Sequence, residues 1–184
     1  MLNAAKKKKE NIVEYILYMW QLEDIIRSCS LDITVISERV ISQLEVDGVE
    51  REEVYHWYEN LIATMQKENI ATWGHLSEIN EIVKELEQLH NGLLNVFQDA
   101  QYIRVYEVAQ ENINTLKNKS SGSVKSDVQA CLNGLYGVLL LRLQKKEISK
   151  ETQDAIQSIS ALMAILAKKY KSKPNLELDK VISN

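Results

Sequence analysis

Proline is nearly absent from this chain of 184 residues, which contains one proline and six glycines. Proline breaks helices because it has no amide hydrogen to donate and clashes with the preceding turn. Its scarcity therefore favours helix along most of the chain, and the low count of both residues argues against long disordered segments. A chain of this length can bury a sizeable core without metals or disulfides.

Cysteine pairs, long apolar runs and an excess of positive charge are also missing, and each absence excludes a class of protein. Cys29 and Cys131 stand far apart and in no metal-ligand spacing. No apolar run approaches the roughly 20 residues of a membrane span, and Glu14 and Asp24 interrupt the first apolar segment, unlike a signal peptide. The net charge of −4 argues against nucleic-acid binding. We expect a reduced, cytoplasmic protein with no nucleic-acid or membrane partner.

Two short lysine clusters depart from the acidic balance of the chain. The first is residues 6–9, and the second consists of Lys168, Lys169, Lys171 and Lys173. The first is typical of a solvated lead-in to a helix, and the second falls in the last turn of a predicted helix, where cations suit the macrodipole. Phosphate or membrane binding by either cluster is the less favoured alternative.

Apolar residues recur at helical spacing in seven segments. The second segment is rich in β-branched residues, so a strand is the alternative there. No strand alternation or fixed-period repeat is present elsewhere. The sequence therefore predicts an all-α fold, an antiparallel bundle of about six to seven helices, with one domain at 1–173 and a tail at 174–184. The predicted segments are about 7–28, 31–44, 50–68, 72–94, 100–117, 124–146 and a last one capped by Ser149.

The segment 124–146 is apolar on two opposite faces, so we expect it to lie between neighbouring helices at the centre of the bundle. Its second face carries small residues, which would let another helix approach closely, either from this chain or from a second copy. The larger face consists of Val128, Cys131, Leu132, Leu135 and Leu139, and the smaller face of Ala130, Gly134, Gly137 and Leu141.

Two charged residues, Glu23 and Arg142, fall on stripes expected to face the core. A lone buried charge is costly, so such residues usually pair. We expect these two side chains to meet or to share a polar pocket between the first and sixth segments, with Arg27 as a local partner of Glu23. The functional alternative is a small anionic ligand at Arg142.

Two Glu-x-x-His motifs, Glu53 with His56 and Glu87 with His90, could in principle supply a di-metal site in a helical bundle. Glu53 and His56 lie on the polar side of their segment, whereas a site in the bundle core needs inward ligands. We therefore expect no metal and no cofactor, and interpret His75 and His90 as partly buried, hydrogen-bonded histidines.

No nucleophile elbow, phosphate loop or dinucleotide-binding motif is present, so no catalytic residue is nominated. Aromatic residues form one further group that could face a partner or a ligand. Packing in the core is the commoner use of such residues. The group consists of Tyr55, Trp57, Tyr58 and Trp73.

Two runs carry a resemblance to a known family: residues 11–24 (NIVEYILYMWQLED) and residues 131–144 (CLNGLYGVLLLRLQ), the latter continuing into KEIS at 146–149. They resemble an all-helical family of Bacteroidota proteins described only as a domain of unknown function, over nearly the whole chain. The resemblance implies a helical, intracellular bacterial protein, and no activity, cofactor or catalytic residue comes with it.

Together these observations favour a non-enzymatic helical interaction or structural protein that self-associates or binds a protein partner. The alternative is a bundle that binds a small ligand, or acts as an enzyme, through a polar interhelical pocket around Glu23 and Arg142.

Overall fold

The computed structural model describes residues 2–120 and 124–172, so the predicted tail at 174–184 lies outside the described residues. Within them the chain forms eight α-helices and one short 3₁₀-helix, with no strand, which confirms the all-α prediction. The elements are α1 (Leu2–Glu10), α2 (Ile12–Ser28), α3 (Ile33–Arg39), η1 (Ile41–Gln43), α4 (Gly48–Lys67), α5 (Ser77–Asn95), α6 (Ala100–Lys119), α7 (Asp127–Leu143) and α8 (Lys150–Lys171).

The first predicted helix is in fact two helices, because Asn11 begins a new one. Its side chain accepts hydrogen bonds from the backbone N–H groups of Val13 and Glu14, as an N-cap does. The β-branched second segment is helical, as predicted, and not a strand. The side chain of Asp32 caps α3 by accepting from the N–H of Thr34.

Most of the remaining helices begin at a residue whose side chain can satisfy a free amide. Asp47, Asp99, Ser126 and Ser149 each accept a hydrogen bond from an N–H in the first turn of α4, α6, α7 and α8, respectively. The predicted cap at Ser149 is thereby confirmed. Helix α5 is different, because Leu76 precedes it and a leucine side chain has no acceptor.

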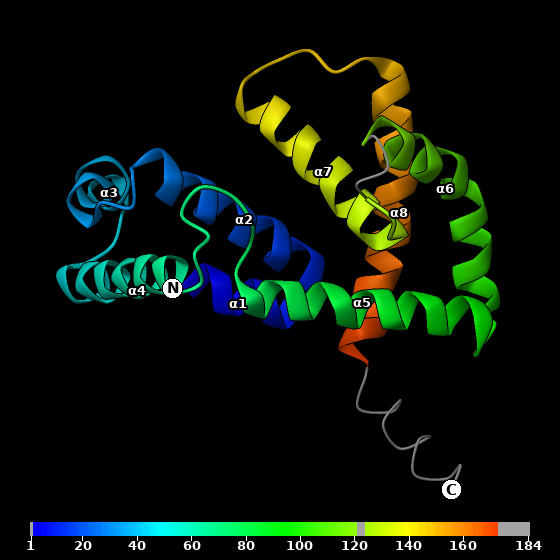
Figure 1. The fold of residues 1–184 in the computed structure, drawn as a ribbon, viewed down its shortest axis with the longest axis horizontal. Helices are drawn as coiled ribbons and strands as arrows, with labels where there is room; N and C mark the ends of the chain where they lie inside the picture. The colour runs from blue at the N-terminus through cyan, green and yellow to red at the C-terminus, as the bar shows by residue number, and fades with distance from the viewer. Residues whose placement is uncertain (1, 121–123, 173–184) are drawn as a thin grey trace, which may run out of the picture.

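The helices form two groups that meet where α2 packs against α7 and α8, and α5 runs along the lower edge of the molecule in Figure 1. Helices α1 to α4 lie on one side, and α6, α7 and α8 lie on the other. Helix α7 contacts α2, α5, α6 and α8, so the predicted central position of the 124–146 segment is confirmed. Helix α5 crosses α8 in this view, and the antiparallel order of neighbouring helices stays a prediction.

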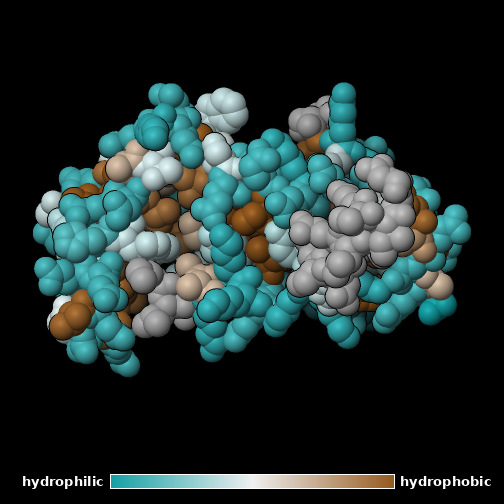
Figure 2. Space-filling view, turned by 90° about the horizontal axis from the view of Figure 1, so that it is seen from below, coloured by the Kyte–Doolittle hydropathy of each residue, from teal (hydrophilic) through white to brown (hydrophobic). Residues whose placement is uncertain are grey.

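The core is one continuous apolar cluster that includes Val128, Cys131 and Leu132 of α7. Among the described side chains, Glu23 and His90 are the charged or polar ones buried in it, with 1% and 4% of their surface exposed. Figure 2 shows one outer face, where hydrophilic residues predominate and hydrophobic ones appear in the hollows between them. No helix in the described part of the chain has both the length and the apolarity needed to cross a membrane.

Candidate functional site

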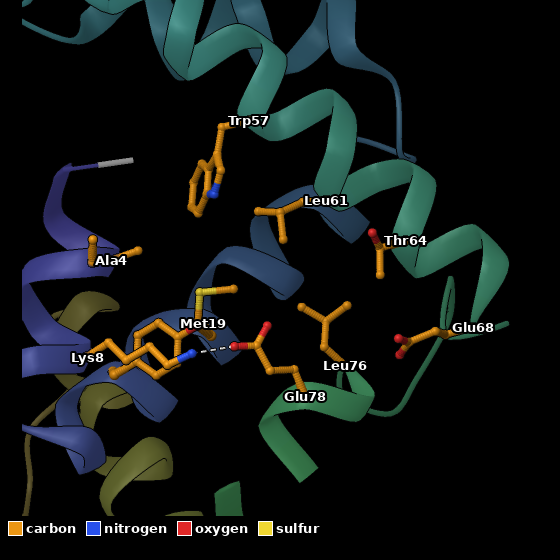
Figure 3. Close-up of a pocket in the computed structure, with 11 residues that line it drawn as sticks. Ala4, Lys8, Met19, Trp57, Leu61, Thr64, Glu68, Leu76 and Glu78 are labelled. Atoms are coloured by element: carbon orange, nitrogen blue, oxygen red, sulfur yellow. Dashed lines mark hydrogen bonds and ion pairs between the residues drawn. The ribbon is translucent and has the colours of Figure 1, made fainter. Parts of the chain in front are cut away.

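A pocket of about 400 Å³ opens between α1 and α2 on one side and α4 on the other, above the first turn of α5 (Figure 3). It combines apolar walls with charged groups that come from several helices. Its lining consists of Ala4, Ala5, Lys8, Tyr15, Met19, Trp57, Leu61, Thr64, Glu68, Leu76 and Glu78.

Helix α4 supplies one wall of this pocket. Trp57, Leu61 and Thr64 recur at helical spacing and therefore share a face, which is half-buried. In Figure 3 the Trp57 ring and the Leu61 side chain project from α4 into the space, toward Met19 of α2. Among the other predicted aromatic residues, Tyr58 is buried in the core and Trp73 is largely exposed on the loop before α5.

The opposite wall carries an ion pair that ties α1 to α5. Lys8 Nζ donates a hydrogen bond to Glu78 Oε1 at 2.6 Å, drawn as a dashed line in Figure 3. This bond raises the pKa of Lys8. The ammonium also lies 5.4 Å from the centre of the Tyr15 ring, and burial raises the pKa of that phenol. Lys8 is therefore a charged group held at the edge of the pocket.

The floor of the pocket is the start of α5, whose first amides are capped by glutamates from other helices. Glu23 Oε1 of α2 accepts from the N–H of Leu76 at 3.0 Å, and Glu68 Oε2 accepts from the N–H of Ser77 at 2.7 Å. These carboxylates satisfy amides that would otherwise lack partners and suit the positive end of the helix dipole. They also fix the position of Leu76, whose side chain lines the pocket.

The other oxygen of Glu23 binds His75. His75 Nδ1 donates to Glu23 Oε2 at 2.6 Å, and the imidazole stacks on Trp20 with ring centres 4.3 Å apart. Arg27, the predicted local partner, lies 4.0 Å from the same oxygen. The predicted role of His75 as a partly buried, hydrogen-bonded histidine is confirmed.

Arg27 mainly binds the loop that precedes α5. Its guanidinium donates to the carbonyl oxygens of Ile70, at 3.2 Å, and Gly74, and forms an ion pair of 2.9 Å with Asp24. Gly74 has a φ of +96°, a conformation that suits glycine. Asp24 in turn accepts a hydrogen bond of 2.6 Å from the hydroxyl of Tyr136. Sequence reasoning missed His75 and Tyr136 as partners, since both are remote from α2 along the chain.

The prediction that Glu23 and Arg142 share a pocket is wrong. Helices α2 and α7 are neighbours, as expected, but they are joined through Asp24 and Tyr136. Arg142 is exposed in the last turn of α7. At that position the helix leaves the core, and a cation suits the negative end of the helix dipole.

A model of the domain of unknown function DUF4924 matches residues 1–177. The chain belongs to this family. No curated protein and no solved structure matches the chain.

The small residues of α7 line a second, apolar groove of about 520 Å³ together with Leu116 of α6. A Cβ atom added at Gly134 would lie 2.7 Å from Leu116 Cδ1, so the close approach predicted there is confirmed. Among the described residues, no heavy atom lies within 4 Å of such a position at Gly137, and this glycine is exposed. The prediction that Gly137 packs closely against another helix is therefore wrong for the described helices of this chain, because α6 does not cover that turn. Ala130 and Leu141 line the same groove.

The four residues of the alternative metal site do not come together. Glu53 and His56 are exposed on α4, where His56 binds Glu59 at 2.8 Å. His90 is buried, and its Nδ1 lies 2.7 Å from the hydroxyl of Tyr102. Within residues 2–120 and 124–172, no group of three or more histidine, cysteine or acidic side chains is arranged to hold a metal ion. Glu87, the fourth residue of the alternative site, therefore belongs to no such group.

His90 belongs to a separate polar cluster at the junction of α5, α6 and α7. Its Nε2 lies 3.7 Å from Asp127 Oδ2, and Asp127 also binds Lys117 at 2.8 Å and the Tyr106 hydroxyl at 2.7 Å. The nearby His90 imidazole, with hydrogen bonds from Lys117 and Tyr106, holds the pKa of Asp127 well below its usual range. Burial raises the pKa of the Cys131 thiol to about 12, which makes this cysteine a poor nucleophile.

Proposed function

We propose that this chain is a non-catalytic binding protein, and that the pocket between α1, α2, α4 and α5 binds a small, mainly apolar molecule. One observation carries the proposal: Trp57 and Leu61 project into a space of about 400 Å³ and are only half-buried there. Protein interiors are normally packed to high density, so a space of this size beside a tryptophan is suited to an occupant.

The size and chemistry of the pocket support this function. Small-molecule sites usually enclose about 300–1,000 Å³, with apolar walls and a few polar groups that orient the ligand. Here Trp57, Leu61 and Met19 provide the walls, and the paired Lys8 and Glu78 provide the polar groups at one edge. The floor is preorganised because Glu23 and Glu68 hold the first turn of α5 in place.

The positions of the reactive groups favour binding over catalysis. The lining contains no histidine, cysteine or serine. The nearby histidine, His75, is not part of the lining, and its Nδ1 is bound to Glu23. The two carboxylates in the lining, Glu68 and Glu78, are bound to the Ser77 amide and to Lys8. An enzyme needs a nucleophile or base directed at a bound substrate.

Fluorine NMR of protein labelled with 5-fluorotryptophan tests the proposal. The chain has three tryptophans, and their signals are assigned with the variants Trp57→Phe and Trp73→Phe. We expect the apolar probe 1-anilinonaphthalene-8-sulfonate to shift the Trp57 signal saturably and to leave the Trp73 signal unchanged. A Trp57 signal that does not move at saturating probe would contradict the proposal.

Two neighbouring positions of α4 provide a matched pair of variants. Thr64 lines the pocket, whereas Ala63 is exposed on another face of the same helix. Thr64→Phe should fill the pocket and weaken probe binding by about tenfold or more, which corresponds to 1.4 kcal/mol. Ala63→Phe should leave binding unchanged. Equal affinities in the two variants, with both folded by circular dichroism, would place the probe elsewhere.

A second candidate function is self-association through the groove of α6 and α7. It is favoured by Gly137, which lines an apolar groove and has no atom of the described residues within 4 Å of the position of an added Cβ. In this proposal a second copy of the chain covers that turn of α7 in the cytoplasm, where the two free, buried cysteines would stay reduced. Light scattering should then give a dimer mass for the wild type and a monomer mass for Gly137→Leu. A wild type that is monomeric at every concentration would exclude this candidate.

A further inference from the structure

The two lysine clusters, which are far apart in the sequence, meet at one place in the structure. Lys8 and Lys9, at the end of α1, and Lys171, at the end of α8, line the same pocket of about 260 Å³. Ile12, Ala167 and Tyr170 also line it, and Ile12 and Ala167 are buried. The pocket therefore has an apolar base with ammonium groups around it.

Two of these lysines have charges that no acid neutralises within the described part of the chain. Lys8, in the first cluster, is bound to Glu78. In the second cluster, Lys169 is bound to Asp99 and does not line the pocket. Lys9 and Lys171 are exposed and have no ion pair within residues 2–120 and 124–172. Glu10 is the one acidic residue in the lining.

Helix dipoles alone do not account for this arrangement. A lysine in the last turn offsets the partial negative charge, about half a unit, at the C-terminal end of its own helix. Helices α1 and α8 together contribute about one negative charge in this way, and Glu10 adds another. Glu78 balances the charge of Lys8, but Lys6 and Lys168, exposed on the same two helices, also have no ion pair among the described residues. Together with Lys9 and Lys171 they exceed this sum, so positive charge remains around the pocket.

We propose that the pocket formed by Lys8, Lys9 and Lys171 binds the phosphate group of a phosphate monoester. A phosphate monoester carries nearly two negative charges at neutral pH, and lysine binds phosphate as a compact point charge. A volume of about 260 Å³ accommodates the phosphate with a short organic group against Ile12 and Ala167. The site is distinct from the apolar pocket, although Lys8 lines both.

The phosphate can come from a soluble metabolite or from a lipid headgroup, and two probes separate these sources. Glycerol 3-phosphate is titrated into the protein by isothermal calorimetry. Cosedimentation is measured with phosphatidylcholine vesicles that contain phosphatidic acid and with vesicles that lack it. The test variant is Lys9→Ala with Lys171→Ala, and the matched control is Lys146→Ala with Lys150→Ala, two exposed lysines at the other end of α8.

We expect the test variant to weaken binding about tenfold or more and the control to change it less than about twofold. Calorimetric binding without cosedimentation assigns the site to a soluble phosphate, and cosedimentation that requires phosphatidic acid assigns it to a headgroup. The proposal is overturned if the wild type binds neither probe. It is also overturned if both double variants lose binding equally, because the attraction is then one of overall charge.

Discussion

Glu23 and His75 are 52 positions apart in the sequence, yet their side chains meet in a hydrogen bond of 2.6 Å. The same carboxylate accepts a hydrogen bond from the amide of Leu76. A single buried side chain on α2 therefore holds both His75, the last residue of the loop, and Leu76, the N-cap residue of α5. This contact connects α2, in the first group of helices, to the start of α5, which packs against α6, α7 and α8.

Replacing Glu23 by alanine should destabilise the protein by about 3 kcal/mol, because the buried Leu76 amide and the partly buried His75 lose their acceptor. Urea unfolding followed by circular dichroism measures the change. Glu81→Ala is the matched control, since Glu81 is largely exposed in an ion pair with Lys84, and its effect should stay within about 0.5 kcal/mol. Similar losses in the two variants would mean that Glu23 acts as a surface charge.

The helices themselves could be predicted from the sequence because apolar spacing reflects burial on one side of each helix. The break at Asn11 was missed for a local reason: the apolar stripe continues across it, while a single capping side chain decides where the new helix begins. The burial of Glu23 was also predictable from its place on the stripe. Its partners were not, because His75 and the Leu76 amide come from a loop whose path depends on tertiary contacts.

The two glycines of α7 should respond in opposite ways to substitution. Gly137→Ala should stabilise the monomer by about 0.5–1 kcal/mol, since alanine favours helix and no atom of the described residues lies within 4 Å of the new methyl group. Gly134→Leu should destabilise it by about 1–3 kcal/mol, because the side chain would clash with Leu116 and Ile156. Thermal unfolding measures both. A gain in stability for Gly134→Leu would show that α6 and α7 can separate there at no cost.

The candidate pocket was less predictable than the core. Trp57 was recognised as a candidate contact, but nothing in its spacing distinguishes a wall of a pocket from a core position. The residues opposite it come from α1, α2 and α5, and only the fold brings them together. Arg142 shows the converse: it falls on an apolar stripe, yet the helix ends there and the side chain reaches solvent.

Asp127 should make folding stability depend on acid pH. Its pKa is lower in the folded protein than the value of about 3.9 in an unfolded chain. Its stabilising contribution is therefore complete above about pH 4 and is lost as the pH falls toward the folded-state pKa. Asp127→Asn should destabilise the protein by about 1–3 kcal/mol at neutral pH. It should also flatten the decline in unfolding free energy below about pH 4, and an unchanged acid slope would assign that decline to other carboxylates.

Arg27 and Arg142 provide a final comparison, because each lies in the last turn of its helix and only one binds a loop. Arg27→Lys should destabilise the protein by about 1–3 kcal/mol, since one ammonium cannot reproduce a planar guanidinium that donates to two carbonyls and to Asp24. Hydrogen exchange of the amides at 70–76 should become faster as the loop opens locally. Arg142→Lys should change neither quantity. If Arg27→Lys leaves the exchange of the loop unchanged, the Ile70 and Gly74 carbonyls do not depend on this side chain, and the loop is held by its other contacts, such as those of Glu23 and Glu68.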